Sequence, residues 1–127
     1  MSSAAIEEFA QILIREVRDA AVRSCDKEFG PMGPTAKGLR WKKAGPEGVV
    51  EAVARAVVPD CVDAVLFRLL NAIDNGDLQL SFKDRAGGTI DLEKEGKGEL
   101  AGWYMMTDGW RGKYAKERFV DDFADSE

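Results

Sequence analysis

The sequence predicts a single α+β domain in which helices come first and a small antiparallel sheet follows. Two observations predict this fold class. Apolar residues recur every three or four positions through about the first 75 residues, and they alternate at every second position between about residues 78 and 93. The chain has 127 residues, the usual size of one domain, and its 45% hydrophobic and 32% charged residues are typical of a globular protein. We therefore expect one folded unit over residues 1–127.

A long amphipathic helix is expected over about residues 3–29. Glu7 and Glu8 lie in its first turn, where carboxylates suit the positive end of the helix dipole. Gly30-Pro31 is expected to end it. The residues that share one face at steps of three and four are Ile6, Phe9, Ala10, Leu13, Val17 and Ala20.

The next segment, at about residues 30–46, is expected to be a basic loop. Its four glycines and three prolines are too many for a regular element. Cations beside an aromatic residue can contact an anionic surface, including the acidic face of a second copy. The alternative is a solvated loop in which the tryptophan packs on the core. The residues of this candidate anion-contact loop are Lys37, Arg40, Trp41, Lys42 and Lys43.

Two further helices, or one helix kinked at Pro59, are expected between Pro46 and Gly76. Proline suits an early helical position, so Pro46-Glu47 marks the start. Because proline disrupts a helix interior, we expect the second helix to end near Val58 and the third to begin around Pro59-Asp60. The expected buried stripe is Val49, Val50, Val53 and Val57 on the second helix, then Val62, Val65, Leu66, Leu69, Leu70 and Ile73 on the third.

A β-hairpin is expected after the helices. Residues 78–83 and 89–93 alternate between apolar and polar, and residues 84–88 supply turn chemistry. The side chains expected to face the core are Leu78, Leu80, Phe82, Ile90 and Leu92.

The rest of the chain is expected to complete the sheet and end in a helix. A lone hairpin is not stable in water, so it must pack on the helices or gain a third strand. Residues 100–106 are expected to form that strand, with a short helix as the alternative. Residues 113–123 are expected to form a short C-terminal helix, followed by a frayed acidic end.

The residue types argue against a catalytic or metal centre. The chain has no histidine, which removes Ser-His-Asp and Cys-His arrangements and histidine metal sites. Cys25 and Cys61 form no Cys-x-x-Cys pair, which argues against structural zinc. The N-terminus lacks the pattern of an export signal, and no apolar run approaches the roughly 18 residues of a membrane helix. We therefore expect a cytoplasmic, non-enzymatic protein with reduced thiols, no cofactor, no metal and no membrane contact.

Two groups of residues are candidate partner-binding surfaces. Asp91, Glu93 and Glu95 are expected to alternate outward on the second strand as an acidic ridge, and an ordinary solvated sheet face is the alternative. Residues 102–111 hold two of the three tryptophans and two of the four methionines. Such residues are enriched in interface cores and are equally suited to a domain core. The candidates from this segment are Trp103, Trp110 and Arg111.

Three functional hypotheses follow. The net charge of −5 disfavours nucleic acid, and it is compatible with solubility alone or with a basic protein partner. The first hypothesis is a small non-enzymatic binding protein that neutralises a basic partner, as bacterial immunity and inhibitor proteins neutralise toxins. The second is a homodimeric structural or regulatory module, with the first helix or the hairpin edge as its self-complementary surface. The third is a small-molecule-binding domain that uses carboxylates with Tyr104 or Tyr114.

Overall fold

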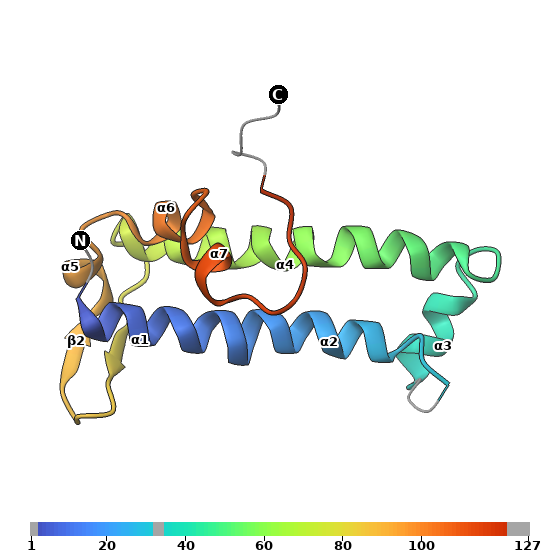
Figure 1. Cartoon of the computed structure of the whole chain (residues 1–127), viewed down its shortest axis with the longest axis horizontal. Coiled ribbons are helices and arrows are strands. Elements are labelled where there is room, and N and C mark those ends of the chain that lie inside the picture. Colours follow the sequence, from blue (N-terminus) through green and yellow to red (C-terminus); the bar gives the residue numbers. More distant parts are fainter. Residues whose placement is uncertain (1–2, 32–34, 122–127) are drawn as a thin grey trace.

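The frame of the molecule is an antiparallel pair of long helical segments. The structure is a computed structural model that describes residues 3–31 and 35–121. The first helical segment, residues 4–27, lies beside helix α4, Val49–Asp74 (Figure 1). Helix α3, Ala36–Lys42, lies at one end of this pair, and a two-stranded antiparallel sheet lies at the other (Figure 1). The predicted α+β class is confirmed in this broad sense.

The first segment is continuously helical, as its periodicity predicts, and it contains a π-helical stretch. Its parts are α1 (Ala4–Ile12), the π-helix η1 (Leu13–Arg18) and α2 (Asp19–Lys27). Ser3 caps the start, because its side chain accepts a hydrogen bond from the Ile6 amide at 3.2 Å. The turns of the π-helix η1 are wider than those of an α-helix, so they interrupt its regular spacing of side chains. Arg18 and Asp19, at the end of η1 and the start of α2, are both buried although they are consecutive.

Helix α4 runs through Pro59, so the prediction of two separate helices is wrong. Proline has no amide hydrogen, which leaves the carbonyl of Arg55 without its usual helical donor. The side chain of Arg118 supplies a replacement, because its Nε donates to the Arg55 carbonyl at 2.9 Å. A donor 63 positions away along the chain therefore satisfies the group that the proline leaves unpaired.

The predicted basic loop is also wrong in part, because α3 lies within it. The Glu28 carboxylate accepts hydrogen bonds from the amide and the hydroxyl of Thr35, both at 2.9 Å, and fixes the start of this helix. These hydrogen bonds lower the pKa of Glu28. Gly38 allows the close approach, since a Cβ there would lie 2.5 Å from a Glu28 carboxylate oxygen. Residues 32–34 of the predicted loop lie outside the described residues.

The predicted hairpin is confirmed but is shorter than expected. Strand β1, Ser81–Lys83, pairs antiparallel with β2, Thr89–Asp91, and Phe82 lies opposite Ile90. Phe82 and Ile90 are half-buried. Leu78 and Leu80, predicted to face the core, precede the strand and are 37% and 41% exposed.

The chain turns from the second strand into a short helix. Asp91 ends β2 and caps α5, Leu92–Gly96, by accepting from the amides of Glu93 and Lys94 at 3.0 and 3.4 Å. Leu92 is buried, as predicted, although it lies on this helix and not on a strand.

The segment predicted to be a third strand is a helix. Residues 100–105 form α6, Leu100–Met105, because Asp74 accepts hydrogen bonds from the amides of Leu100 and Ala101 at 3.0 and 2.9 Å. Helix α7 spans Trp110–Tyr114, and residues 115–121 are not helical, so the predicted helix over residues 113–123 is wrong in its described part. The remainder of that prediction and the acidic end lie at residues 122–127, outside the described residues.

The hydrophobic core lies at the sheet end of the helix pair. Helix α6 packs on α4, and α7 packs on α1 and η1. On α4 the core begins only at Leu66, so the first half of this long helix contributes nothing to it. The buried core residues are Ile6, Ala10, Leu13, Ile14, Leu66, Leu70, Ile73, Leu92, Leu100, Ala101, Tyr104 and Trp110.

Candidate protein-binding surface

A buried ionic network holds the middle of the molecule together. Asp63 of α4 accepts hydrogen bonds from Arg18 Nε at 2.7 Å, from Arg111 Nη1 at 2.9 Å and from the Tyr104 hydroxyl at 2.7 Å. Arg18, Asp63 and Arg111 are 0%, 3% and 2% exposed. Burial raises the pKa of Tyr104, and the neighbouring Asp63 carboxylate raises it further. This phenol therefore stays protonated and acts as a donor to Asp63.

The same network fixes the segment that follows α7. Arg18 also pairs with Asp19 at 2.8 Å, and Asp19 accepts from the Lys116 amide at 2.7 Å. Burial alone lowers the pKa of Arg18, but hydrogen bonding and charge from Asp63 outweigh it and raise the pKa. Arg18 Nη2 donates to the Arg118 carbonyl at 2.6 Å. Two arginines and two aspartates balance in charge, which makes this a structural cross-link between distant elements.

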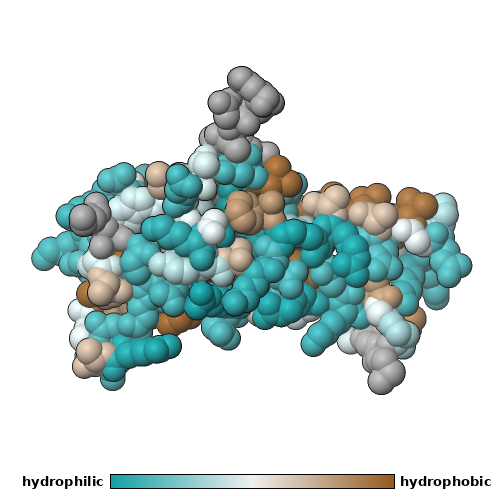
Figure 2. All heavy atoms as spheres, in the orientation of Figure 1, coloured by the Kyte–Doolittle hydropathy of each residue, from teal (hydrophilic) through white to brown (hydrophobic). Residues whose placement is uncertain are grey.

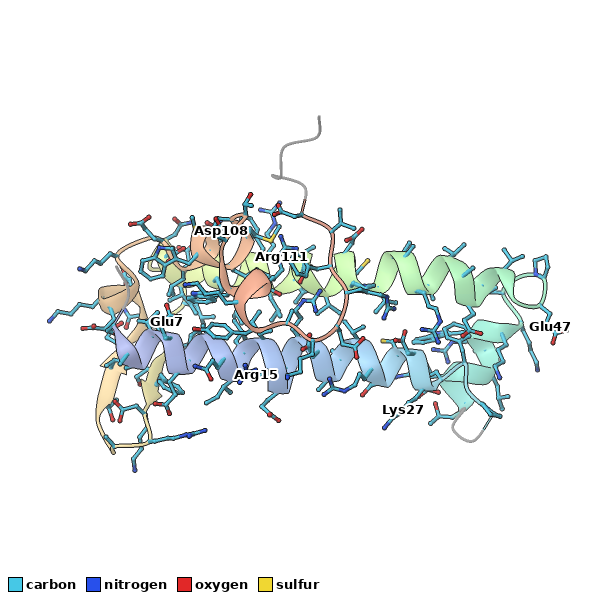
Figure 3. The ribbon with its side chains drawn as sticks, in the orientation of Figure 1. Glu7, Arg15, Lys27, Glu47, Asp108 and Arg111 are labelled. Atoms are coloured by element: carbon cyan, nitrogen blue, oxygen red, sulfur yellow. The ribbon has the colours of Figure 1, made fainter. Side chains whose placement is uncertain are left out.

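The structure places Trp110 and Arg111 in the interior and not on a surface. Trp110 is 1% exposed, and its ring lies 6.1 Å from Phe9 and 6.3 Å from Trp103, measured between centroids. Figure 3 shows Arg111 toward the middle of the molecule. For these two residues the core alternative is the correct one. Trp103 is half-buried and retains an accessible edge.

The predicted acidic ridge is not a strand face. Asp91 is exposed at the end of β2, whereas Glu93 and Glu95 are half-buried on α5. The wider region is nevertheless acidic, because residues 72–108 carry eight carboxylates and four cations. This region includes the sheet and α5, at the end of the molecule opposite α3 (Figure 1).

The predicted cationic residues gather at the α3 end. Lys37, Arg40, Lys42 and Lys43 are exposed. Trp41 is half-buried, since its ring packs 5.7 Å from that of Phe29, and the Lys37 ammonium lies 5.4 Å from its ring centroid. The alternative of a solvated loop with Trp41 on the core is wrong, because Trp41 lies on α3 and packs on Phe29, away from the hydrophobic core.

An uncharged, partly exposed surface lies toward the α3 half of the helix pair. Val49, Val53, Val57 and Val65 of α4 are 51%, 56%, 46% and 67% exposed. Two hollows of about 500 and 400 Å³ lie along this side and share Trp41 and Val58. Neither hollow has a charged residue in its lining. We call this surface the apolar face; its residues are Val17, Ala21, Cys25, Phe29, Trp41, Ala44, Gly45, Pro46, Val49, Val50, Val53, Ala54, Val57, Val58, Cys61, Val62, Val65 and Leu66.

The apolar face corrects the prediction of a buried stripe on the first half of α4. Val49, Val53 and Val57 share one side of the helix, as their spacing predicts, but no element of the described chain covers them. Val65, which was also predicted to be buried, is 67% exposed and lies about 160° around the helix from Val49. The segment after α7 covers another side of the pair, where Arg118 contacts Asp26 at 3.0 Å as well as the Arg55 carbonyl. Figure 2 shows part of the apolar face as a row of hydrophobic side chains along α4, toward the α3 end.

The remaining chemistry of the described residues is limited. Both cysteines, Cys25 and Cys61, are free thiols that line the apolar face. Across residues 3–31 and 35–121 no three metal-binding side chains come together. None of the helices in these ranges combines the length and the apolar character needed to cross a bilayer. No family model, curated protein or solved structure matches the chain.

Tyr104 and Tyr114 already have polar partners within the protein. The Tyr104 hydroxyl donates to Asp63, and the Tyr114 hydroxyl donates to Glu7. Tyr104 is also completely buried. The predicted use of these phenols in a small-molecule site has no support from this geometry.

Proposed function

We propose that the protein is a non-enzymatic protein-binding module that contacts its partner through the apolar face. One observation carries this proposal. Four valines of α4 are each about half-exposed or more, and the two hollows beside them are lined by uncharged residues. Contiguous apolar patches of several hundred Å² on a folded protein mark interaction sites.

The size of the apolar face supports a protein partner over a small ligand. Val49 and Val65 are 16 positions apart on α4, which corresponds to about 24 Å of helix. The two hollows along this length hold about 500 and 400 Å³ and share Trp41 and Val58, so an apolar surface continues from one to the other.

The buried network supports the same proposal by keeping the face preformed. Asp63, Arg18 and Arg111 cross-link the helix pair to α7 immediately beside the apolar face. Arg118 adds a second link, from the C-terminal segment to Asp26 of α2. A surface that is already ordered loses little conformational entropy on binding.

The test compares two matched substitutions. Val53 and Val120 are 56% and 57% exposed, but only Val53 belongs to the apolar face. A carboxylate buried in an apolar interface costs several kcal/mol, so Val53→Glu should lower partner recovery from native cells at least 100-fold. Val120→Glu should leave recovery unchanged. Equal recovery with Val53→Glu and with the unmodified chain would refute the assignment of this face.

Neutralisation of a basic partner, in the manner of an immunity or inhibitor protein, is the second candidate function. The excess of carboxylates over residues 72–108 supports it, with Asp91, Glu93, Glu95 and the accessible edge of Trp103 as the contact residues. A basic partner should then associate more slowly with Asp91→Asn, and more slowly at high salt. An association rate that depends on neither change would contradict this candidate.

A further inference from the structure

We infer that the site holding residues 115–121 is a peptide-binding site, and that a second copy of this chain can supply the same segment to it. The ligand is an extended peptide in which an arginine is followed by an aromatic residue. We call residues 115–121 the docked segment. This inference does not involve the apolar face, because the docked segment covers another side of the helix pair.

The docked segment is bound as a ligand is bound, and not as an element of the fold. It follows α7 and is neither helix nor strand. Within residues 3–31 and 35–121, its residues 116–120 form no hydrogen bond to another backbone atom. Backbone groups that lack such partners need side chains or water instead.

Buried side chains of the first helical segment bind its backbone. Asp19 accepts from the Lys116 amide at 2.7 Å, and Arg18 Nη2 donates to the Arg118 carbonyl at 2.6 Å. Arg18 Nη1 also donates to the Glu117 carbonyl at 3.4 Å. These contacts read an extended backbone and not a particular side chain, which is how a site holds a peptide in one register.

Two side chains of the docked segment supply the specificity. Arg118 Nη1 and Nη2 donate to the two carboxylate oxygens of Asp26, each at 3.0 Å, and Nε donates to the Arg55 carbonyl at 2.9 Å. Such a two-pronged pair selects arginine over lysine. The ring of Phe119 lies with its centroid 4.7 Å from the Arg111 guanidinium carbon, a contact that selects an aromatic residue.

The site is held in place by groups that do not belong to the docked segment. Asp63 of α4 accepts from Arg18 Nε at 2.7 Å and from Arg111 Nη1 at 2.9 Å. Both arginines therefore keep a carboxylate partner when the docked segment leaves. A site that is ordered beforehand loses little conformational entropy on binding.

A second copy carries an identical ligand. Every contact described above joins the docked segment to a residue outside it, so exchange of the segment between two chains reproduces each contact. Ala115 has extended backbone angles and is the hinge that this exchange requires. The chain's own segment competes at an effective concentration of about millimolar, so the closed monomer is expected at micromolar concentration. Exchange becomes visible when the contact within one chain is weakened.

A charge reversal divided between two chains tests the second copy. Arg118→Asp places a carboxylate opposite its own Asp26, and Asp26→Arg places a guanidinium opposite its own Arg118, so each variant repels its own docked segment. Exchange between the two variants pairs the two introduced charges and restores the native pair. At about 100 µM, an equal mixture should contain at least about ten times more dimer than either variant alone, measured by native mass spectrometry.

The control is the chain that carries both substitutions. It has opposite charges within one molecule again and should remain monomeric, like the unmodified chain. Circular dichroism establishes that each variant is folded. A mixture that remains monomeric overturns the second copy as the source of the segment.

A labelled peptide tests the site itself. A fluorescent peptide with the sequence of residues 114–121 should bind the full chain with Arg118→Ala at least about tenfold more tightly than the unmodified chain, because its own segment then competes less. Alanine in place of the arginine of the peptide should abolish this gain. Adding Val53→Glu to the chain should leave binding unchanged, since Val53 belongs to the apolar face. Equal binding to both chains, no binding, or a loss with Val53→Glu would overturn the peptide-binding site.

Discussion

Replacing Asp63 by asparagine removes the carboxylate that three other side chains share. Arg18 Nε, Arg111 Nη1 and the Tyr104 hydroxyl all donate to it, at 2.7, 2.9 and 2.7 Å. Asparagine keeps the volume of the side chain but has no charge, and its amide nitrogen cannot accept from a guanidinium. The two buried arginines are then left with Asp19 as the remaining buried aspartate of the network.

The expected loss is a large part of the total stability. Removing one partner of a buried ion pair costs about 3–5 kcal/mol, because a charge stays buried without compensation. Domains of this size unfold with about 5–15 kcal/mol. For a chain of this length, each kcal/mol lost from the free energy of unfolding lowers the Tm by about 3–5 °C, so the Tm should fall by about 10–20 °C.

Urea unfolding, followed by tryptophan fluorescence, measures this loss. Trp110 is 1% exposed and packs near the network, so its emission reports the core. The matched control is Asp60→Asn, three residues earlier on α4 and exposed, which should change stability by no more than about 0.5 kcal/mol. If the free energy of unfolding of Asp63→Asn were within about 1 kcal/mol of that of the unmodified chain, the network would not be a principal structural cross-link.

Three further predictions concern single residues. Burial raises the pKa of Tyr104 and Tyr114 above the ordinary value of 10.0, so the absorbance of these phenols should titrate at higher pH in the native chain than in urea. Because the unfolded chain loses these protons first, the free energy of unfolding should fall as the pH rises above about 10, and coincident titration curves would contradict this. Asp74→Ala should cost about 1 kcal/mol in urea unfolding, because the first amides of α6 lose their cap, and an unchanged midpoint would show that the cap is dispensable. Pro59→Ala should stabilise the chain by about 1 kcal/mol, because the restored backbone hydrogen bond outweighs the displaced Arg118 contact, and lower stability would show the reverse.

The sequence determined the elements whose hydrogen bonds are local. The first helical segment and the paired strands β1 and β2 follow from hydrophobic periods of about 3.6 and 2, which fix the side chains that share a face. The absence of histidine likewise determined which catalytic arrangements the chain lacks. These features need no knowledge of what packs against them.

Tertiary contacts decided the elements that local propensity predicts wrongly. Helix α4 continues through Pro59 because Arg118 supplies a donor, and α6 forms because Asp74, 26 positions before Leu100, caps it. Glu28 fixes the start of α3 from only seven positions away. For α4 and α6, however, a side chain distant along the chain satisfies a backbone group, and no pattern within a short window of sequence contains that partner.

The candidate site shows the same division. Periodicity placed Val49, Val53 and Val57 on one side of a helix and predicted that this side is buried. Only the tertiary structure decided that the core ends at Leu66 and leaves that side exposed. It also decided that Arg111 belongs to the interior, because Asp63 compensates its charge there. A sequence determines which side chains share a face, but whether anything covers that face depends on where the rest of the chain packs.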